Sequence, residues 1–460
     1  MVLRKQQQTD PPKKVNPTGR RGHKADGSKE IRMAGLPGRK EEESMKGLKT
    51  GFVVIAAALI TFGLSGMAFA FHSGGVAECV GCHHIHDAAG GALLANTDAS
   101  STCLSCHDST SASSYHISTA ESVLGPGIPP GNRTPGGDFA WLKKTYTYNV
   151  RGLVTEEGQT HGHNIVAADF NYVADTTNLT NPGGAGEVDS TTFGCTDCHD
   201  QHGKLRRLSD GTFAVTGEPI IASGSYHNSP DPGGGLAVGA YRLLRGAGSA
   251  AGPSGVTFPI LGNGAFNAVA PSSYNRTEAV TPTRVAYGQN TSDWCATCHE
   301  EMHSPVSTKL THPTNQPLGT TVAGIYNSYV GSGDATGTSA TSFDSIVPFQ
   351  TDNSNDYTVM KALATPTVTT GPASSDRVMC LSCHRAHATG WEFMTRWDNE
   401  IEMIVIDGQW PGIDLAGEAS NPKWSKGRTN AERAKAYNDK PASSYATYQR
   451  VLCNKCHAKD

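Results

Sequence analysis

Cysteine and histidine occur in this sequence at a spacing that can attach haem. All 12 cysteines fall into six C-x-x-C pairs, and a histidine directly follows each pair. In a c-type haem the two thiols of C-x-x-C-H bond the vinyl groups of the porphyrin, and the histidine is the proximal ligand of the iron. The cysteines are Cys79, Cys82, Cys103, Cys106, Cys195, Cys198, Cys295, Cys298, Cys380, Cys383, Cys453 and Cys456. The proximal histidines are His83, His107, His199, His299, His384 and His457. The sequence therefore predicts six c-type haems.

Two other uses of paired cysteines fit the sequence less well. A thioredoxin-like C-x-x-C occurs once in a chain and needs no histidine after it. A zinc site combines two cysteine pairs, or cysteines with histidines, at finger spacing. Successive motifs here mostly stand roughly 70 to 100 residues apart. The count and spacing thus favour haem over zinc and over thiol redox chemistry.

Further histidines are available for the second axial position of each iron. Leaving out His23, 17 of the 18 histidines remain, and 11 of these lie outside the six motifs. Two histidines on each of six irons would use six of the 11. An iron with two histidine ligands has no open position, so it carries electrons and does not readily bind a substrate. We therefore expect an electron-transfer protein rather than an enzyme.

Three of these histidines follow a motif at the same offset, in C-x-x-C-H-x-x-H. They are His86 in CVGCHHIH, His202 in CTDCHDQH and His387 in CLSCHRAH. Each is too close in sequence to reach the opposite face of its own haem easily, but each can reach an adjacent haem. His303 stands one residue further on, in CATCHEEMH. The alternative for any one of them is a surface residue or a propionate partner.

The remaining histidines divide into two groups. The other candidates for distal ligands are His72, His116, His163 and His312. We expect His84, His161 and His227 to be dispensable, because each is near a better candidate or sits in a polar loop.

The sequence from Met45 to Ala70, MKGLKTGFVVIAAALITFGLSGMAFA, has the pattern of a secretory signal. A basic start, an apolar run and a small-residue A-x-A site follow one another. The apolar run is shorter than the roughly 20 residues of a membrane-spanning helix, which is the alternative. We expect residues 45–70 to be removed and the mature chain to be one domain, 71–460. Residues 1–44 are a disordered tail or, better, the product of a start codon placed too far upstream.

Charge and composition narrow the class of protein. The first 70 residues contain 13 of the 38 Lys and Arg and 6 of the 42 Asp and Glu, so the rest has 25 basic and 36 acidic residues. The resulting net charge of −11 disfavours nucleic acid or an anionic membrane as a partner. With 52 Gly and 25 Pro, long stretches show no helical or strand period.

Such a chain can fold around the haems, which take the place of an ordinary core. The expected fold is a multihaem cytochrome c, mostly irregular, with short helices and few strands wrapped around a linear array of six haems. The best helix candidates are residues 430–439 and 445–457. Residues 141–150 alternate well enough for a strand.

Several segments resemble one known family. FHSGGVAECVGCHHIH, TPGGDFAWLKKTYTYNVRGL, GHNIVAADFNYVADTT, CLSCHRAHATG and YQRVLCNKCHAKD are similar to the OmcS-type hexahaem cytochromes of metal-respiring bacteria. The similarity covers nearly all of residues 71–460, with six motifs in the same order. It implies end-to-end polymers outside the cell, a continuous chain of haems and two histidines on each iron. It also implies that His86 crosses to the next subunit and completes the site of His384, and it gives no role to His84.

The prediction is a secreted electron conduit that reaches the cell surface through the periplasm. Its partners would be copies of itself, periplasmic or outer-membrane cytochromes as donors, and, as the resemblance implies, iron(III) oxides, electrodes or cells as acceptors. One alternative is a monomeric periplasmic or surface shuttle with the same haems. The other is a multihaem reductase, which the six intact motifs disfavour because such enzymes often replace a motif histidine. Replacement of His86 separates conduit from shuttle, and carbon monoxide binding tests for a reductase.

Overall fold

The computed structural model describes residues 79–112, 115–177, 188–258, 265–271, 283–303, 312–329, 337–352 and 354–458. The chain divides into two units, Met1–Gly66 and Met67–Asp460, and every described residue belongs to the second. The predicted extension 1–44, the predicted signal 45–70 and His72 lie outside the described residues, as does the side chain of His303. The prediction of a single domain from residue 71 to 460 stays a prediction.

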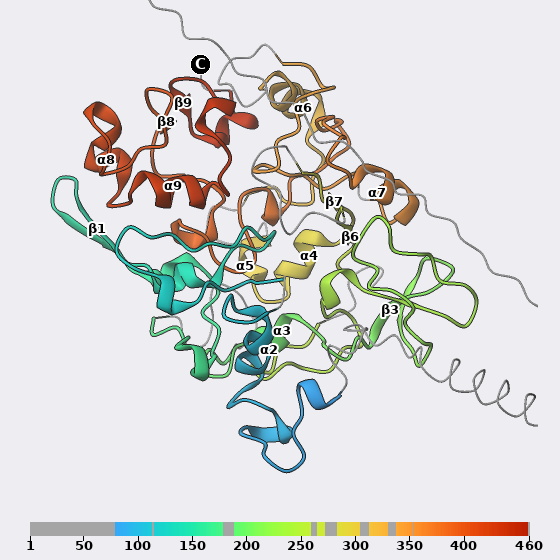
Figure 1. The fold of residues 1–460 in the computed structure, drawn as a ribbon. Helices are drawn as coiled ribbons and strands as arrows, with labels where there is room; N and C mark the ends of the chain where they lie inside the picture. Colours follow the sequence, from blue (N-terminus) through green and yellow to red (C-terminus); the bar gives the residue numbers. More distant parts are fainter. Residues whose placement is uncertain are drawn as a thin grey trace, which may run out of the picture. The chain divides into compact units, whose positions relative to one another are not determined.

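The described helices are short, and the longest has ten residues. They are α2 (Ala99–His107), α3 (Cys195–Cys198), α4 (Thr291–Ala296), α5 (Glu300–His303), α6 (Gly319–Ser328), α7 (Tyr357–Leu363), α8 (Pro422–Ser425) and α9 (Asn430–Ala436). Single turns of 3-10 helix and irregular backbone connect them (Figure 1). Within the described part of the chain, no helix has the length and apolarity to cross a membrane. The low content of regular structure confirms the predicted fold class.

The strands form small antiparallel sheets. They are β1 (Tyr146–Asn149), β2 (Leu153–Glu156), β3 (Leu205–Arg207), β4 (Phe213–Val215), β5 (Val238–Gly239), β6 (Ala268–Val269), β7 (Ala286–Tyr287), β8 (Met403–Val405) and β9 (Gln449–Arg450). Strands β1 and β2 make a hairpin in which Tyr146 faces Glu156. The other sheets have the orders β4-β3-β5, β6-β7 and β8-β9.

Two of the three predicted elements need correction. The helix predicted at 430–439 is present as α9, which Thr429 and Glu432 cap reciprocally. The helix predicted at 445–457 is wrong, because β9 pairs with β8 and only a 3-10 turn, Leu452–Lys455, follows. In the strand predicted at 141–150, the first residues instead end a 3-10 helix, Phe139–Lys143, and β1 begins at Tyr146.

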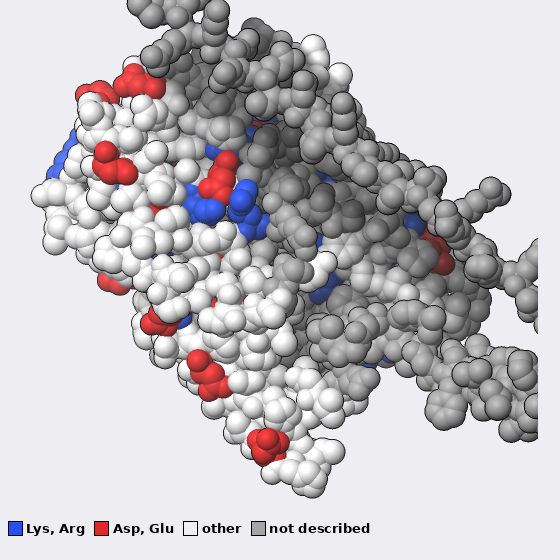
Figure 2. All heavy atoms as spheres, in the orientation of Figure 1, with Lys and Arg blue, Asp and Glu red and all other residues white. Residues whose placement is uncertain are grey.

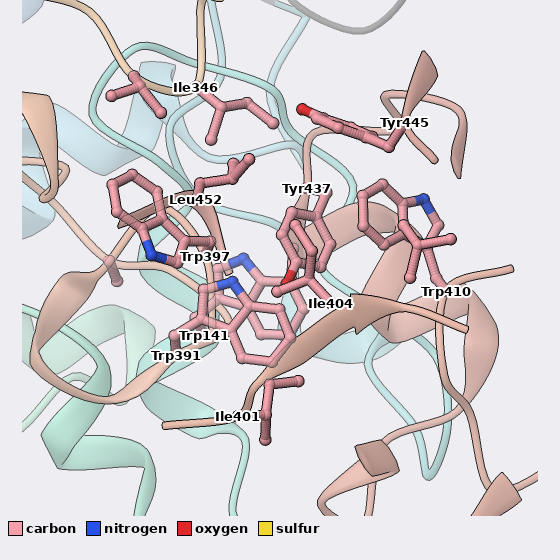
Figure 3. Close-up of a cluster of buried hydrophobic side chains, with 14 of the residues drawn as sticks. Trp141, Ile346, Trp391, Trp397, Ile401, Ile404, Trp410, Tyr437, Tyr445 and Leu452 are labelled. Atoms are coloured by element: carbon pink, nitrogen blue, oxygen red, sulfur yellow. The ribbon is translucent and has the colours of Figure 1, made fainter. Parts of the chain in front are cut away.

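Besides the core that the haems were expected to provide, the described chain packs an apolar core of its own side chains, most of them from its C-terminal part. Trp391, Trp397 and Trp410 are at most 4% exposed and pack with Ile404 and Tyr437 (Figure 3). The rings of Trp410 and Tyr437 are stacked, with their centroids 3.9 Å apart. Aromatic residues are concentrated here, and their large side chains contribute most of the buried surface of this core.

Charges on the described surface and inside it are arranged differently. On the face in Figure 2, Asp and Glu side chains are scattered, while the largest group of Lys and Arg lies near the centre of the view. Inside, Arg428 is fully buried and donates to Glu156, with Nη1 3.2 Å from Oε2, and also to the carbonyl of Gly390. His161 Nε2 lies 2.9 Å from the other oxygen of Glu156. Burial alone would raise the pKa of Glu156, but Arg428 and His161 bring it well below its usual range.

Candidate haem-binding sites

Each motif folds into one tight turn that brings its cysteines and histidine to one side. The backbone N–H of the proximal histidine donates to the carbonyl of the first cysteine, as from His83 to Cys79 at 2.8 Å and from His457 to Cys453 at 2.9 Å. In α2, Cys103, Cys106 and His107 occupy helix positions i, i+3 and i+4. Residues at these spacings share a helix face, so the two sulfurs and the imidazole can approach one porphyrin.

The first, third and fifth motifs share a second feature. Nδ1 of the proximal histidine lies 2.9, 2.7 and 2.7 Å from a backbone carbonyl in His83, His199 and His384, respectively. The three acceptors belong to Ala92, Arg242 and Phe393. His107 of the second motif uses the carbonyl of Tyr115 in the same way, at 2.7 Å. When Nδ1–H donates, Nε2 keeps its lone pair, which is the state that an iron ligand requires.

The acceptor residues adopt an unusual backbone conformation. Ala92, Arg242 and Phe393 have φ of 55°, 51° and 58°, and the residue after each also has positive φ. Side chains disfavour this left-handed region, which is tolerated where the surroundings enforce it. The same strained pair therefore occurs in three copies, each time to hold a proximal imidazole. Sequence reasoning missed these residues, because GAL, YRL and EFM have no common side-chain signal.

Four proximal histidines face a second histidine at a nearly constant distance. A metal–nitrogen bond of about 2 Å on each side places the ring centroids of two imidazoles on one iron roughly 6 Å apart. The observed centroid distances are 6.5 Å for His83–His202, 6.0 Å for His299–His163, 6.3 Å for His199–His387 and 6.3 Å for His457–His312. Each pair can thus hold one haem iron between its rings.

The other predicted candidates are placed differently. His116 Nε2 lies 3.3 Å from the Ser111 hydroxyl, and His86 is exposed. The roles of His116, His86 and His72 as ligands stay predictions. His161 is fully buried with both ring nitrogens hydrogen-bonded, to Trp141 O and to Glu156. It acts as a structural residue in a buried ion-pair network, whereas the sequence had suggested only that it was dispensable.

His163 and His387 meet in an antiparallel contact that we call the clasp, formed by residues 161–163 and 387–389. The His163 backbone N–H donates to His387 O at 2.9 Å, and its Nδ1 lies 2.8 Å from Ala386 O. Gly162 bridges to Ala388, where a Cβ on Gly162 would stand 2.5 Å from the alanine Cβ. The clasp therefore orients His163 and carries His387 on the opposite strand.

The cysteines show how the motifs follow one another. The Cys103 thiol lies beside Cys195, and hydrogen bonding between the two thiols raises the pKa of Cys103. Hydrogen bonding with Cys380 raises the pKa of Cys295 in the same way. Burial, and then the neighbouring thiols Cys106, Cys298 and Cys456, raise the pKa of Cys82, Cys198 and Cys383. Each motif is thus near the next, in sequence order. Helix α2 of the second motif also packs on α3 of the third (Figure 1).

The order of histidines and motifs repeats three times along the sequence. Each unit has a leading histidine, a C-x-x-C-H-x-x-H motif with a trailing histidine, and a C-x-x-C-H motif. Unit 1 runs from His72 to His107, unit 2 from His163 to His299 and unit 3 from His312 to His457. In units 2 and 3 the leading histidine pairs with the second motif of its own unit. The trailing histidine of units 2 and 3 pairs with the first motif of the preceding unit.

Comparison with known proteins places the chain in a family. Residues 72–112 match the family model of the doubled CXXCH motif. The chain is 49% identical to the C-type cytochrome OmcS of Geobacter sulfurreducens over 442 residues, which are 90% of this chain and 100% of the relative. It also matches a cryo-EM structure of the OmcS nanowires from that organism, with 47% identity and a TM-score of 0.75, and a structure of the outer membrane cytochrome S filament, with 48% and 0.75. Both matches cover 85% of this chain and 100% of the solved chain. The chain belongs to the OmcS family of multihaem c-type cytochromes.

Proposed function

We propose that this protein binds six c-type haems and conducts electrons along a filament built from copies of itself outside the cell. The observation that carries the proposal is the repeated pairing of proximal and distal histidines at about 6 Å. The pairs fit iron held between two imidazoles, which supplies one-electron chemistry and leaves no position for a substrate. The chain's own residues position the ligands and keep Nε2 available.

The position of the leading histidines supports a role as distal ligand of the haem at the second motif of each unit. His163 faces His299 and His312 faces His457, in each case the second motif of the same unit. By the same register, His72 would be the distal ligand of the haem iron whose proximal ligand is His107. This leaves His116 outside the ligand set, in agreement with its contact to Ser111.

The pairing of the trailing histidines supports the inference that one haem of each subunit receives its distal ligand from the neighbouring subunit. His202 and His387 each complete the first motif of the preceding unit. Within the described residues, His384 of unit 3 has no histidine ring against it, and His86 of unit 1 is exposed. The register continues across a subunit junction if His86 of the next copy pairs with His384. A ligand given at one end and received at the other makes a heterologous contact, which extends into an open filament when it does not close.

Conduction then needs only that neighbouring haems lie close together. The contacts between cysteines of successive motifs support a linear order from the first motif to the sixth. Electrons would enter from periplasmic or outer-membrane cytochromes and leave to metal oxides, electrodes or other cells. Secretion through the periplasm, directed by the signal at residues 45–70, would bring the protein to the outside of the cell, where the filament forms.

The experiment that tests the proposal is His86→Ala, with His84→Ala as the matched control. His84 lies in the same loop; its ring Nδ1 lies 3.4 Å from an Asp87 carboxylate oxygen, and its backbone N–H donates to Leu93 O at 2.8 Å. We expect filaments from the control and monomers from His86→Ala, in which about one haem in six binds carbon monoxide after reduction. Filaments from His86→Ala, or a wild-type chain that remains monomeric, would contradict the proposal and favour the shuttle. Carbon monoxide binding by the wild-type filament at most of its haems would favour a reductase.

A further inference from the structure

The clasp exists once among the described residues, yet the repeat provides the elements for a second one. In the clasp, the leading histidine of unit 2 is held by the residues before and at the trailing histidine of unit 3: Ala386 O accepts from Nδ1 and His387 O accepts from the backbone N–H. One loop therefore does two things. It supplies His387 to the site of His199, and it orients His163 for the site of His299.

The corresponding leading histidine in unit 3 lacks these two bonds. His312 has the same local turn as His163, because in both cases the backbone N–H two residues later donates to the histidine carbonyl. The Thr314 N–H donates to His312 O at 2.7 Å, and the Ile165 N–H donates to His163 O at 2.9 Å. His312 also faces a proximal histidine at the same distance as the other pairs. However, within the described chain neither its backbone N–H nor its Nδ1 has a hydrogen-bond partner, and the residue is exposed.

The matching acceptors lie in unit 1. Ile85 and His86 stand in unit 1 where Ala386 and His387 stand in unit 3, directly before and at the trailing histidine. In the described residues, no donor reaches Ile85 O or His86 O, and both residues are exposed, Ile85 to 71%. Within the described part of the chain, the unpaired donors of His312 and the unpaired acceptors of Ile85 and His86 thus occupy equivalent positions of the repeat.

We propose that each subunit junction contains a second clasp, between His312 of one copy and the Ile85–His86 loop of the next. The His312 backbone N–H donates to His86 O, and His312 Nδ1–H donates to Ile85 O. The inference rests on the proposed filament and names a further contact in it. The incoming loop then completes the site of His384 and also orients the distal ligand of the last motif, as residues 386 and 387 do inside the chain.

The surface around the junction fits this arrangement. Ile85 beside the trailing histidine and Phe393, whose carbonyl holds His384, are 71% and 62% exposed. These apolar side chains border the two halves of the proposed contact, so docking would remove both from water. The partner that fits is a second copy of this chain, because its register matches residue by residue.

Hydrogen exchange of backbone amides tests the second clasp, with the internal clasp as the reference. We expect the His163 amide to be protected in both the filament and the His86→Ala monomer. The His312 amide should be protected in the filament only, with exchange slowed there by about tenfold or more, because it gains an acceptor. A cryo-EM map of the filament should also place His312 Nδ1 within about 2.7–3.2 Å of Ile85 O of the next copy.

The outcomes separate this inference from the proposed function. Filaments in which the His312 amide exchanges as fast as in the monomer, while His163 stays protected, would overturn the second clasp and leave the filament intact. A map with His312 Nδ1 facing another acceptor would do the same. Absence of filaments from the wild-type chain would overturn both.

Discussion

The most specific prediction concerns Gly136, which lies against a distal histidine. A Cβ at this position would stand 2.6 Å from Nδ1 of His387 and 2.8 Å from its Cγ. Ordinary contact begins near 3.4 Å, so in Gly136→Ala the imidazole must retreat by about 0.8 Å. Phe139 stacks on the same ring at 4.6 Å, and Gly136 O accepts the His387 N–H at 2.8 Å, which limits the directions of escape.

The displacement exceeds what a ligand site tolerates. Functional side chains need to be held within about 0.5 Å of their working position. We therefore expect the pair His199–His387 to weaken in Gly136→Ala, while the other pairs stay intact. In the reduced protein, about one haem in six should become able to bind carbon monoxide. Filaments should still form, because the junction uses His86 and not His387.

The assay is titration of the reduced filament with carbon monoxide, followed by the absorbance of the haem. The matched control is Gly217→Ala, since a Cβ at Gly217 meets nothing within 4 Å. A Gly136→Ala filament with the same carbon monoxide binding and the same potentials as the control would refute the assignment of His387 as a ligand held in place by this close approach.

Three further predictions concern buried charges. Arg428→Met leaves Glu156 without its main partner and should destabilise the protein by about 3–5 kcal/mol. Lys143→Met, at the more exposed pair with Glu121, should cost at most about 1 kcal/mol. Denaturant unfolding midpoints of the two variants test this difference. Because the folded pKa of Glu156 is depressed, its contribution to stability is complete above the unfolded pKa of about 4.3 and is lost progressively as the pH falls from there toward the folded pKa. The midpoint of Glu156→Gln should consequently change less between pH 7 and pH 3 than that of the wild type, and an equal change would contradict the reasoning. Lys455, inside the last motif, is fully buried and donates to Ser342 O at 2.8 Å. Lys455→Met removes a positive charge there and should lower the potential of the haem at that motif in a redox titration, and an unchanged titration would contradict this.

The haem attachment sites were predictable because covalent chemistry fixes their residues at adjacent positions. Cys79, Cys82 and His83 act within one turn, so their spacing alone identifies them. Sequence reasoning also predicted that the trailing histidines are ligands for another haem. It expected an adjacent haem, and in the structure the His202 ring lies 6.5 Å from the ring of His83 in the first motif.

Which motif comes within reach depends on long-range packing, which local spacing does not encode. The packing of α2 on α3, where the Cys103 thiol lies beside Cys195, brings segments far apart in the sequence together. The carbonyl of Phe393 holds His384 through the backbone, and backbone acceptors leave no mark in residue type. The tryptophan-rich core escaped prediction for a related reason, since its residues come from irregular segments without a period.

The central claim is that the histidine register of the repeat continues from one subunit to the next. Cryo-electron microscopy of the protein sheared from the cell surface tests it most directly. We expect filaments with continuous haem density, in which the iron beside His384 is bound on its other side by His86 of the next subunit. Separate particles, or an iron at His384 bound by a histidine of its own chain, would contradict it.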